Sequence, residues 1–464
     1  MDTFDEYIIE SELAKNLDDS FSPLIENVMR SYELPGLAIG IVADTEIVYA
    51  KGFGVKSIET GEPISMTTIF HMASISKPFV ATAIMQCVER GQIQLDAPII
   101  TYLPYFKLDD ERYSSITVQQ MLSHVSGMPD VEDYEWDKPQ YDEGALERYV
   151  RSLTSKKLLS EPGAKFAYSN MAFECLGDVI AKVSGMPFDD YVKRHILNPA
   201  GMAESSFLKP EHLPENWAAP HVRALVTLAW EGYPYNRRHG PSSTLHSNAL
   251  EMCNWAITNL KRGNFGRNQI LSPSSYDILW KPWVEISEGE QMGLSWFLEE
   301  YRGERIIEHG GGDTGFRTHL DILPDKGAAV VVLCNLIPAP GWEIARSALD
   351  IILGYEPDPI IPQAGLIVCK TLSEKGLDAA VAQWDSLKSN HPDEYDFSPQ
   401  QFSNLFTAMS VERVQDAESI ARLCARILPE PDVKAIKDRL EGYQNESAAV
   451  VLRAIRGGEE AACA

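Results

Sequence analysis

The sequence predicts an α+β fold: an antiparallel sheet flanked by helices with an inserted helical lobe, followed by an all-α C-terminal region. The first observation is that strand-like apolar runs occur near residue 40 and again after residue 290. The second is that the segment between them, about 92–270, has helical patterns and long loops. The third is a proline-rich break at 355–362, after which only helical patterns follow.

The N-terminal part predicts one helix, a hairpin and a second helix. Residues 6–32 have the pattern of an acidic amphipathic helix. Two strand-like runs, "LPGLAIGIVAD" and "EIVYAKGFGVK", flank a polar turn and predict a β-hairpin. Good helix formers follow in "ATAIMQCVERG", and Gly91 is a suitable helix end.

Strand patterns return after the helical lobe, and these runs are "GLSWFLEEY", "ERIIEHG", "TGFRTHLDILP" and "GAAVVVLCNL". The last run is continuously apolar, which indicates a central strand. Residues 341–354 predict a closing helix. Since strands stand at both ends of residues 1–355, we expect one domain whose sheet is completed by its two termini. A site between sheet and lobe would lie in a natural cleft.

The C-terminal part predicts a linker at 356–364 and a helical domain at 365–464. Its sequence repeats a helix, then Pro-Asp, then more helix, with a period of roughly 38 residues. This pattern resembles a tetratricopeptide-type repeat, and a plain helical bundle is the alternative. We expect this region to offer a surface for a homodimer or a protein partner.

Composition restricts the function classes. The net charge of −26 argues against nucleic acid or an anionic membrane as a partner. No apolar run approaches the length of a membrane span, and no basic leader pattern precedes the first helix. The seven cysteines form no C-x-x-C pair and the histidines have no zinc-type spacing, so we expect a cytoplasmic protein without metal or cofactor.

The first candidate motif is "HMASISKPFV", which contains Ser74 and Lys77. Residues three apart on a helix share a face, so the lysine amine can reach the serine oxygen. In a dry site, burial lowers the lysine pKa, and a neutral amine can take the serine proton. In the alternative reading, Ser74 caps the helix and Lys77 extends to solvent.

Two further motifs contain groups that suit acyl transfer. In "FAYSNMAFECLG", Tyr168 and Asn170 point the same way if the segment is extended; otherwise the tyrosine fills the core and the asparagine caps a helix. In "IIEHGGGDTGF", glycines follow His309 and let backbone N–H groups face an oxyanion. A phosphate loop would need G-K-[ST], and an α/β-hydrolase would need G-x-S-x-G; the chain contains neither.

With these three motifs in this order, residues 20–355 resemble the serine β-lactamase and penicillin-binding-protein family, which includes class C β-lactamases, D-aminopeptidases and esterases. The segments "LPGLAIGIV", "MLSHVSGMPD" and "GPSSTLHSNALEM" add to the resemblance. It implies the β-lactamase/transpeptidase fold and a serine hydrolase that passes through an acyl-enzyme.

The resemblance also implies residue roles. Ser74 would be the nucleophile, Lys77 its base, and Tyr168 a proton relay to the leaving group. Asn170 would hold Lys77 and contact the substrate. His309 would replace the lysine of the third motif. The backbone N–H groups of Ser74 and Gly312 would form the oxyanion hole, and Gly311 would let the substrate lie close to the backbone.

The third motif departs from the Lys-Thr-Gly of β-lactamases, because His309 is no permanent cation. We therefore expect hydrolysis of small esters, amides or D-amino-acid derivatives, with weak β-lactamase activity at most. Arg317 is a candidate replacement for the missing cation. The alternatives are a β-lactamase or D-alanyl-D-alanine carboxypeptidase proper, and a catalytically idle scaffold on this fold.

Overall fold

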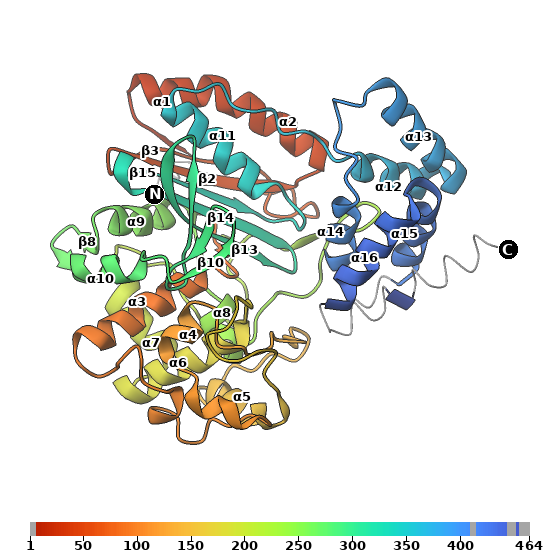
Figure 1. Cartoon of the computed structure of the whole chain (residues 1–464). Helices are drawn as coiled ribbons and strands as arrows, with labels where there is room; N and C mark the ends of the chain where they lie inside the picture. The colour runs from red at the N-terminus through yellow and green to blue at the C-terminus, as the bar shows by residue number, and fades with distance from the viewer. Residues whose placement is uncertain (1–5, 409–413, 443–451, 454–464) are drawn as a thin grey trace.

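The computed structural model describes residues 6–408, 414–442 and 452–453 and has one large sheet at its centre (Figure 1). The sheet has nine strands in the order β1-β3-β2-β15-β14-β13-β12-β11-β10, and every neighbouring pair is antiparallel. The strands are β1 Glu6–Ile8, β2 Gly36–Ala43, β3 Glu46–Gly54, β10 Val284–Ser287, β11 Glu290–Met292, β12 Phe297–Tyr301, β13 Glu304–Asp313, β14 Phe316–Leu323 and β15 Ala328–Cys334. Since β2 pairs with β15, the N-terminal hairpin completes the sheet of the later strands, which confirms the predicted fold.

The sheet separates two apolar cores, because successive side chains of a strand point to opposite faces. In β15, Val331 and Leu333 face the core formed with the helical lobe. Val330 and Val332 face the other core, which contains α2 Ser22–Tyr32 and α11 Gly341–Leu353. Both faces of the central strands are therefore covered by helices, as the continuously apolar run predicted.

The helical lobe lies below the sheet in the view of Figure 1. Its helices are α3 Ser76–Glu89, α4 Val118–Leu122, α5 Ala145–Ser152, α6 Asn170–Ser184, α7 Phe188–Val192, α8 Gly240–Ser243, α9 Ala249–Leu260 and α10 Pro273–Leu279. Short two-stranded pairs connect them: β4 Phe70–His71 with β7 His246–Ser247, β5 His221–Arg223 with β6 Thr227–Ala229, and β8 Asn264–Phe265 with β9 Asn268–Gln269. Helix α9 packs directly on β2 and β15, so this end of the lobe belongs to the sheet's own cover.

The N-terminal segment differs from the single helix that its pattern predicts. Residues Glu6–Ile8 form β1, which pairs with β3 at the edge of the sheet. The chain then turns at Ser11, whose side chain caps α1 Glu12–Asn16, and a five-residue π-type turn leads to α2. An open sheet edge offers unpaired backbone groups, and pairing with them competes with the helical pattern at these first residues.

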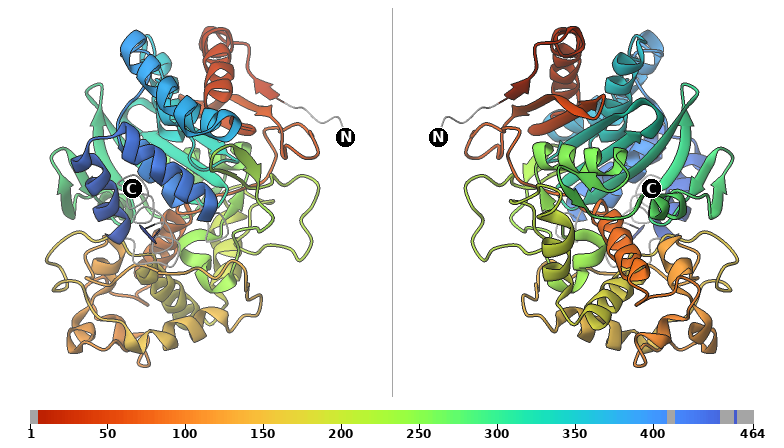
Figure 2. Two further views of the ribbon diagram at one scale, coloured as in Figure 1. Left: turned by 90° about the vertical axis from the view of Figure 1, so that its right-hand side faces the viewer. Right: turned by 90° about the vertical axis from the view of Figure 1, so that its left-hand side faces the viewer.

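The C-terminal helices pack on the side of the sheet that carries α2 and α11. They are α12 Ala364–Lys375, α13 Leu377–Asn390, α14 Gln400–Ala408, α15 Val414–Ile427 and α16 Glu430–Gly442. Their buried side chains, Trp384 and Phe402 among them, belong to the same apolar core as those of α2 and α11. Figure 2 shows these helices beside the sheet; the rest of the predicted domain 365–464 lies outside the described residues. Within the described ranges, no helix is both long and apolar enough for a membrane crossing.

Candidate active site

Ser74 lies in the turn immediately before α3, and Lys77 lies in the first turn of that helix. The backbone N–H of Lys77 donates to the carbonyl of Ser74 at 3.0 Å, so the turn keeps the i, i+3 relation. Ala73 precedes it with φ at +49°, which is strained for a residue with a Cβ. The Nζ of Lys77 lies 2.9 Å from the Oγ of Ser74, as the spacing of the motif predicts.

Lys77 is fully buried, and its Nζ also donates to the backbone carbonyl of Ser242 at 2.8 Å. Burial lowers the pKa of Lys77 to about 8, because a charged amine is poorly solvated there. The negative charges of Asp130, Glu174 and Asp313 oppose this shift. A large share of Lys77 amines is therefore neutral near pH 8 and able to accept a proton.

Tyr168 lies just before α6 and faces the same pair. Its phenol is within hydrogen-bonding reach of Ser74, and burial raises the pKa of Tyr168 above its ordinary value. The Nζ of Lys77 lies 5.0 Å from the centre of the tyrosine ring. The ring stacks on His124 with 4.1 Å between centroids, while Nδ1 of His124 accepts from the N–H of Ser169. His124 thus fixes the position of Tyr168 from behind.

Asn170 is the first residue of α6, but its side chain is held by Asp130. The Nδ2 of Asn170 lies 2.9 Å from Oδ1 of Asp130, which also accepts from the Asn170 N–H at 2.8 Å. In the part of the chain that the structure describes, Lys77 makes its hydrogen bonds to Ser74 and Ser242 instead. The predicted contact from Asn170 to Lys77 is not formed: the Asn170 N–H groups donate to Asp130, and its Oδ1, the atom that could accept from Lys77, is buried without a hydrogen-bond partner in the described residues. Asp130 lies in the quoted segment "MLSHVSGMPD", where nothing indicated this contact.

His309 lies on β13 and is almost fully buried. Burial and the nearby charge of Lys77 lower the pKa of His309 to about 3, so the imidazole is neutral. Its Nδ1 hydrogen-bonds to the carbonyl of Gly310 at 2.7 Å, and Nε2 has no hydrogen-bond partner within the described ranges. The third motif consequently places a neutral ring where β-lactamases carry a lysine.

Gly311 lies where β13 passes closest to the segment before the serine. A Cβ at Gly311 would be 2.3 Å from the carbonyl oxygen of Met72 and 2.3 Å from Oγ1 of Thr318. That hydroxyl donates to the same Met72 carbonyl at 2.8 Å. Strands β13 and β14 therefore hold the backbone leading into Ser74, and only a glycine leaves room for it.

Gly312 is exposed, and its neighbour across β14 is Arg317. Paired residues of an antiparallel sheet share a face, so Arg317 lies on the face opposite to His309 and Gly311. A Cβ at Gly312 would meet Nη1 of Arg317 at 2.9 Å, which places the guanidinium on that outer side. Arg317 is therefore poorly placed to supply a cation on the face that carries His309 and Gly311.

The same outer face carries Glu308, His319 and Asp321, whose possible ligand atoms lie within 4.8 Å of one another. Nε2 of His319 lies 3.0 Å from Oδ1 of Asp321, and Nε of Arg346 from α11 lies 3.6 Å from Oδ2. The arginine already supplies a cation to this cluster, which packs between β14 and α11 and points away from Ser74.

A buried hydrogen-bond chain supports Lys77 from behind. The hydroxyl of Ser242 donates to Oε1 of Glu174 at 2.5 Å, and Nδ1 of His239 donates to the same oxygen at 3.1 Å. Since Nε of Arg238 donates to Nε2 of His239, the proton of this neutral imidazole lies on Nδ1. Burial raises the pKa of Glu174 to about 8. Sequence patterns did not single out these residues, because only the fold brings α6 and α8 together.

Asp313 is the last residue of β13, on the face of His309 and Gly311. Its Oδ2 accepts hydrogen bonds from Nε2 of His71 at 2.9 Å and from the hydroxyl of Ser243. Ser243 is the next residue after Ser242, whose backbone carbonyl accepts a hydrogen bond from Lys77. Asp313 was also missed in the sequence, where it reads as part of a glycine-rich turn.

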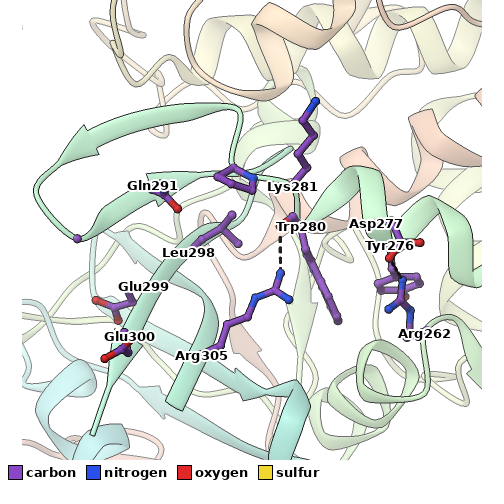
Figure 3. A pocket seen from close by; sticks show the side chains of 12 residues that line it. Arg262, Tyr276, Asp277, Trp280, Lys281, Gln291, Leu298, Glu299, Glu300 and Arg305 are labelled. Atoms are coloured by element: carbon purple, nitrogen blue, oxygen red, sulfur yellow. Dashed lines mark hydrogen bonds and ion pairs between the residues drawn. The ribbon is translucent and has the colours of Figure 1, made fainter. Parts of the chain in front are cut away.

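A cavity of about 650 Å³ lies elsewhere, between α10 and the strands β11 and β12 (Figure 3). Tyr276, Trp280 and Leu298 line it, and Arg305 donates to the carbonyl of Trp280 at 3.0 Å. None of the predicted site residues lines this cavity. The candidate site is thus defined by converging polar groups rather than by this hollow.

Comparison with known proteins agrees with the family resemblance of the three motifs. The beta-lactamase family model matches residues 21–350. Protein flp from Staphylococcus aureus strain MW2 is 24% identical over 325 residues, which cover 70% of this chain and 64% of that protein. Unguisins hydrolase ungD' from Aspergillus campestris is 26% identical over 370 residues, covering 74% of this chain and 66% of that protein. The chain therefore spans less than two thirds of the length of either relative.

Solved structures show the same fold. The octameric penicillin-binding protein homologue from Pyrococcus abyssi is 26% identical, with a TM-score of 0.63 and coverage of 79% of this chain and 82% of that chain. D-alanine carboxypeptidase AmpC from Burkholderia cenocepacia is 21% identical, with a TM-score of 0.61 and coverage of 74% and 99%. With the family model matching well over half of its residues, this chain belongs to the beta-lactamase family.

Proposed function

We propose that this chain is a serine hydrolase that forms an acyl-enzyme on Ser74. The observation that carries the proposal is the 2.9 Å contact between the Oγ of Ser74 and the Nζ of Lys77, a fully buried amine. A nucleophile and a base within hydrogen-bonding distance are the minimum that acyl transfer by serine requires.

In the proposed mechanism, the neutral amine of Lys77 takes the proton of Ser74 as the hydroxyl oxygen attacks the carbonyl carbon. Backbone N–H groups of Ser74 and Gly312 stabilise the oxyanion. Tyr168, within reach of Ser74, passes a proton to the departing alcohol or amine. Water then cleaves the acyl-serine and restores the hydroxyl. Gly311 leaves room for the Met72 backbone that leads into Ser74, and Asn170, held in place by Asp130, is the proposed substrate contact from α6.

The substrates proposed for this site are small esters and amides, including D-amino-acid derivatives. The neutral state of His309 supports this choice, because the site lacks the cation that would anchor the carboxylate of a β-lactam. The relative called unguisins hydrolase is a hydrolase by name, at 26% identity. A β-lactamase or D-alanyl-D-alanine carboxypeptidase proper is the second candidate, and the neighbour of that name supports the fold alone.

Covalent labelling tests the nucleophile. Intact-mass spectrometry after treatment with a fluorophosphonate is expected to show one adduct on the protein and none on Ser74→Ala. Ser126→Ala, which removes another buried serine of the lobe, is the matched control and keeps the adduct. Labelling that persists in Ser74→Ala would overturn the proposal, and absence of both adduct and ester turnover in the unmodified chain would favour an idle scaffold.

Substrate competition tests the preference. We expect p-nitrophenyl acetate and butyrate to be cleaved with kcat/KM at least about tenfold above that for nitrocefin or benzylpenicillin, which corresponds to about 1.4 kcal/mol in transition-state binding. The physical reason is the missing cation at position 309. Fast, saturable nitrocefin hydrolysis would instead identify a β-lactamase.

A further inference from the structure

Asp313 stands at the edge of the proposed site with one carboxylate oxygen fixed and the other available. Both hydrogen bonds of the side chain, from His71 and Ser243, end on Oδ2. The Asp313 side chain is only 8% exposed, and its partner His71 is fully buried. Oδ1 accepts no hydrogen bond from the described residues and is not fully enclosed, so the edge of the carboxylate can still be reached. Two donors thus hold Oδ2 of Asp313, and Oδ1 is the oxygen without a hydrogen bond in the described residues.

The position of Asp313 ties it to the reacting groups. It follows Gly311 by two residues on β13, and Gly311 packs on the backbone just before Ser74. Its partner Ser243 follows Ser242, whose carbonyl binds Lys77. Because side chains two apart on a strand share a face, the carboxylate lies on the side of the nucleophile.

The surroundings of the Ser74–Lys77 pair are acidic. The carboxyl groups that act on Lys77 belong to Asp130, Glu174 and Asp313. Burial raises the pKa of Glu174 to about 8, so at pH 7 the negative charges are those of Asp130 and Asp313. In the described part of the chain, the ion-pair partner recorded for Asp313 is His71, a residue without a permanent charge. At pH 7 Lys77, with a pKa of about 8, offsets one of these two negative charges, and the remaining negative charge repels an incoming anion and attracts an incoming cation.

We propose that Asp313 is a specificity-determining residue, and that the site selects esters or amides carrying an ammonium or quaternary ammonium group near the scissile bond. This inference rests on the proposed function, since it concerns the substrate of the same serine. It adds the chemical class of that substrate: a cation whose charge is received by Oδ1 of Asp313.

Two pairs of esters, each differing only in charge, test the inference. In the first pair the acyl group varies: p-nitrophenyl 4-(trimethylammonio)butyrate against its neutral carbon isostere, p-nitrophenyl 5,5-dimethylhexanoate. In the second pair the alcohol varies: butyrylcholine against 3,3-dimethylbutyl butyrate. We expect kcat/KM for the cationic member of at least one pair to exceed that of its isostere by about 10- to 100-fold, the effect of a charged hydrogen-bonding partner.

The variant Asp313→Asn keeps an oxygen for His71 and Ser243 but removes the charge. We expect the cationic-to-neutral ratio to fall to within about threefold of unity, and the ratio within one variant cancels any general loss of activity. Asp325→Asn, which removes an exposed carboxylate from the turn after β14, is the matched control and keeps the ratio. In the unmodified protein, raising the ionic strength from about 0.01 M to about 1 M should also reduce the ratio.

Each outcome separates the two proposals. Ser74-dependent turnover with equal kcat/KM for charged and neutral esters in both pairs would overturn the role of Asp313 and leave the proposed function standing. A preference for the cationic esters that is unchanged in Asp313→Asn would also overturn the role of Asp313 and leave the proposed function standing. Absence of Ser74-dependent turnover for all four esters would overturn the proposed function, and this inference with it.

Discussion

Replacing Lys77 with methionine is expected to reduce kcat/KM for p-nitrophenyl butyrate by about 10³-fold or more while leaving the fold intact. The methionine side chain fills a similar volume, so it creates little cavity. It cannot accept the proton of Ser74, and loss of a positioned general base typically costs 10²- to 10⁴-fold. Steady-state kinetics and circular dichroism check the two parts of this prediction.

The pH dependence of the unmodified protein gives a second measure of Lys77. Since the base must be neutral and the pKa of Lys77 is lowered to about 8, kcat/KM should rise with pH and level off above about pH 8. Lys107→Met, at an exposed lysine of the lobe, is the matched control and keeps both the rate and the profile. Activity of Lys77→Met within a few-fold of the unmodified protein would show that another group is the base.

Lys77→Met should also make the protein more stable at neutral pH. Between pH 8 and 10.5 the unfolded lysine binds a proton that the folded one does not, so the free energy of unfolding of the unmodified protein rises with pH across this window. Below pH 8 the full cost of the buried charge, roughly 3 kcal/mol, is present. The variant avoids this cost but loses the hydrogen bonds of the lysine, so its free energy of unfolding is expected to be about 1–2 kcal/mol higher than that of the unmodified protein. Thermal unfolding at pH 7 and pH 10.5 should show this gain at pH 7 only.

Gly311→Ala is expected to cost about 10²-fold or more in activity together with about 1–3 kcal/mol of stability. The new Cβ would lie 2.3 Å from the carbonyl oxygen of Met72, and backbone cannot move aside as a side chain can. Any relief must shift the segment leading into Ser74, and with it an N–H of the proposed oxyanion hole, where loss of one donor costs 10²–10³-fold. Kinetics with p-nitrophenyl butyrate and denaturant unfolding measure the two effects.

Gly310→Ala is the matched control for this prediction. It changes the preceding glycine of the same strand, where a Cβ would meet Nδ1 of His319 at 3.4 Å, an ordinary contact. Neither Gly310 nor Gly311 has a positive φ, so the backbone accepts alanine at both positions. Activity within about threefold is expected for Gly310→Ala. Equal losses of activity in the two variants would indicate that β13 tolerates no side chain at either position. The contact with the Met72 carbonyl would then not explain the loss in Gly311→Ala.

Much of the fold was predictable, because hydrophobic periodicity reports which segments bury a face. The hairpin of β2 and β3, the apolar strand β15 and the closing helix α11 all follow from such patterns. The first residues were not predictable in this way: β1 forms because an edge of the sheet is available beside it. Pairing with a strand that is distant in the sequence leaves no pattern in the local sequence. The same holds for the apolar core that α12–α16 share with α2 and α11.

For the candidate site, the sequence by itself determined that a serine stands three residues from a lysine, with a tyrosine motif and a glycine-rich strand further along the chain. The contact between a serine and a lysine can be predicted from the sequence, because a separation of three residues on a helix sets the distance between their side chains. The tertiary structure alone decided that Asp130 holds Asn170, that Ser242 and Glu174 stand behind Lys77, and that Asp313 binds His71. These contacts join residues that are 40 to 242 positions apart, and only the packing of the lobe against the sheet sets the distances between them.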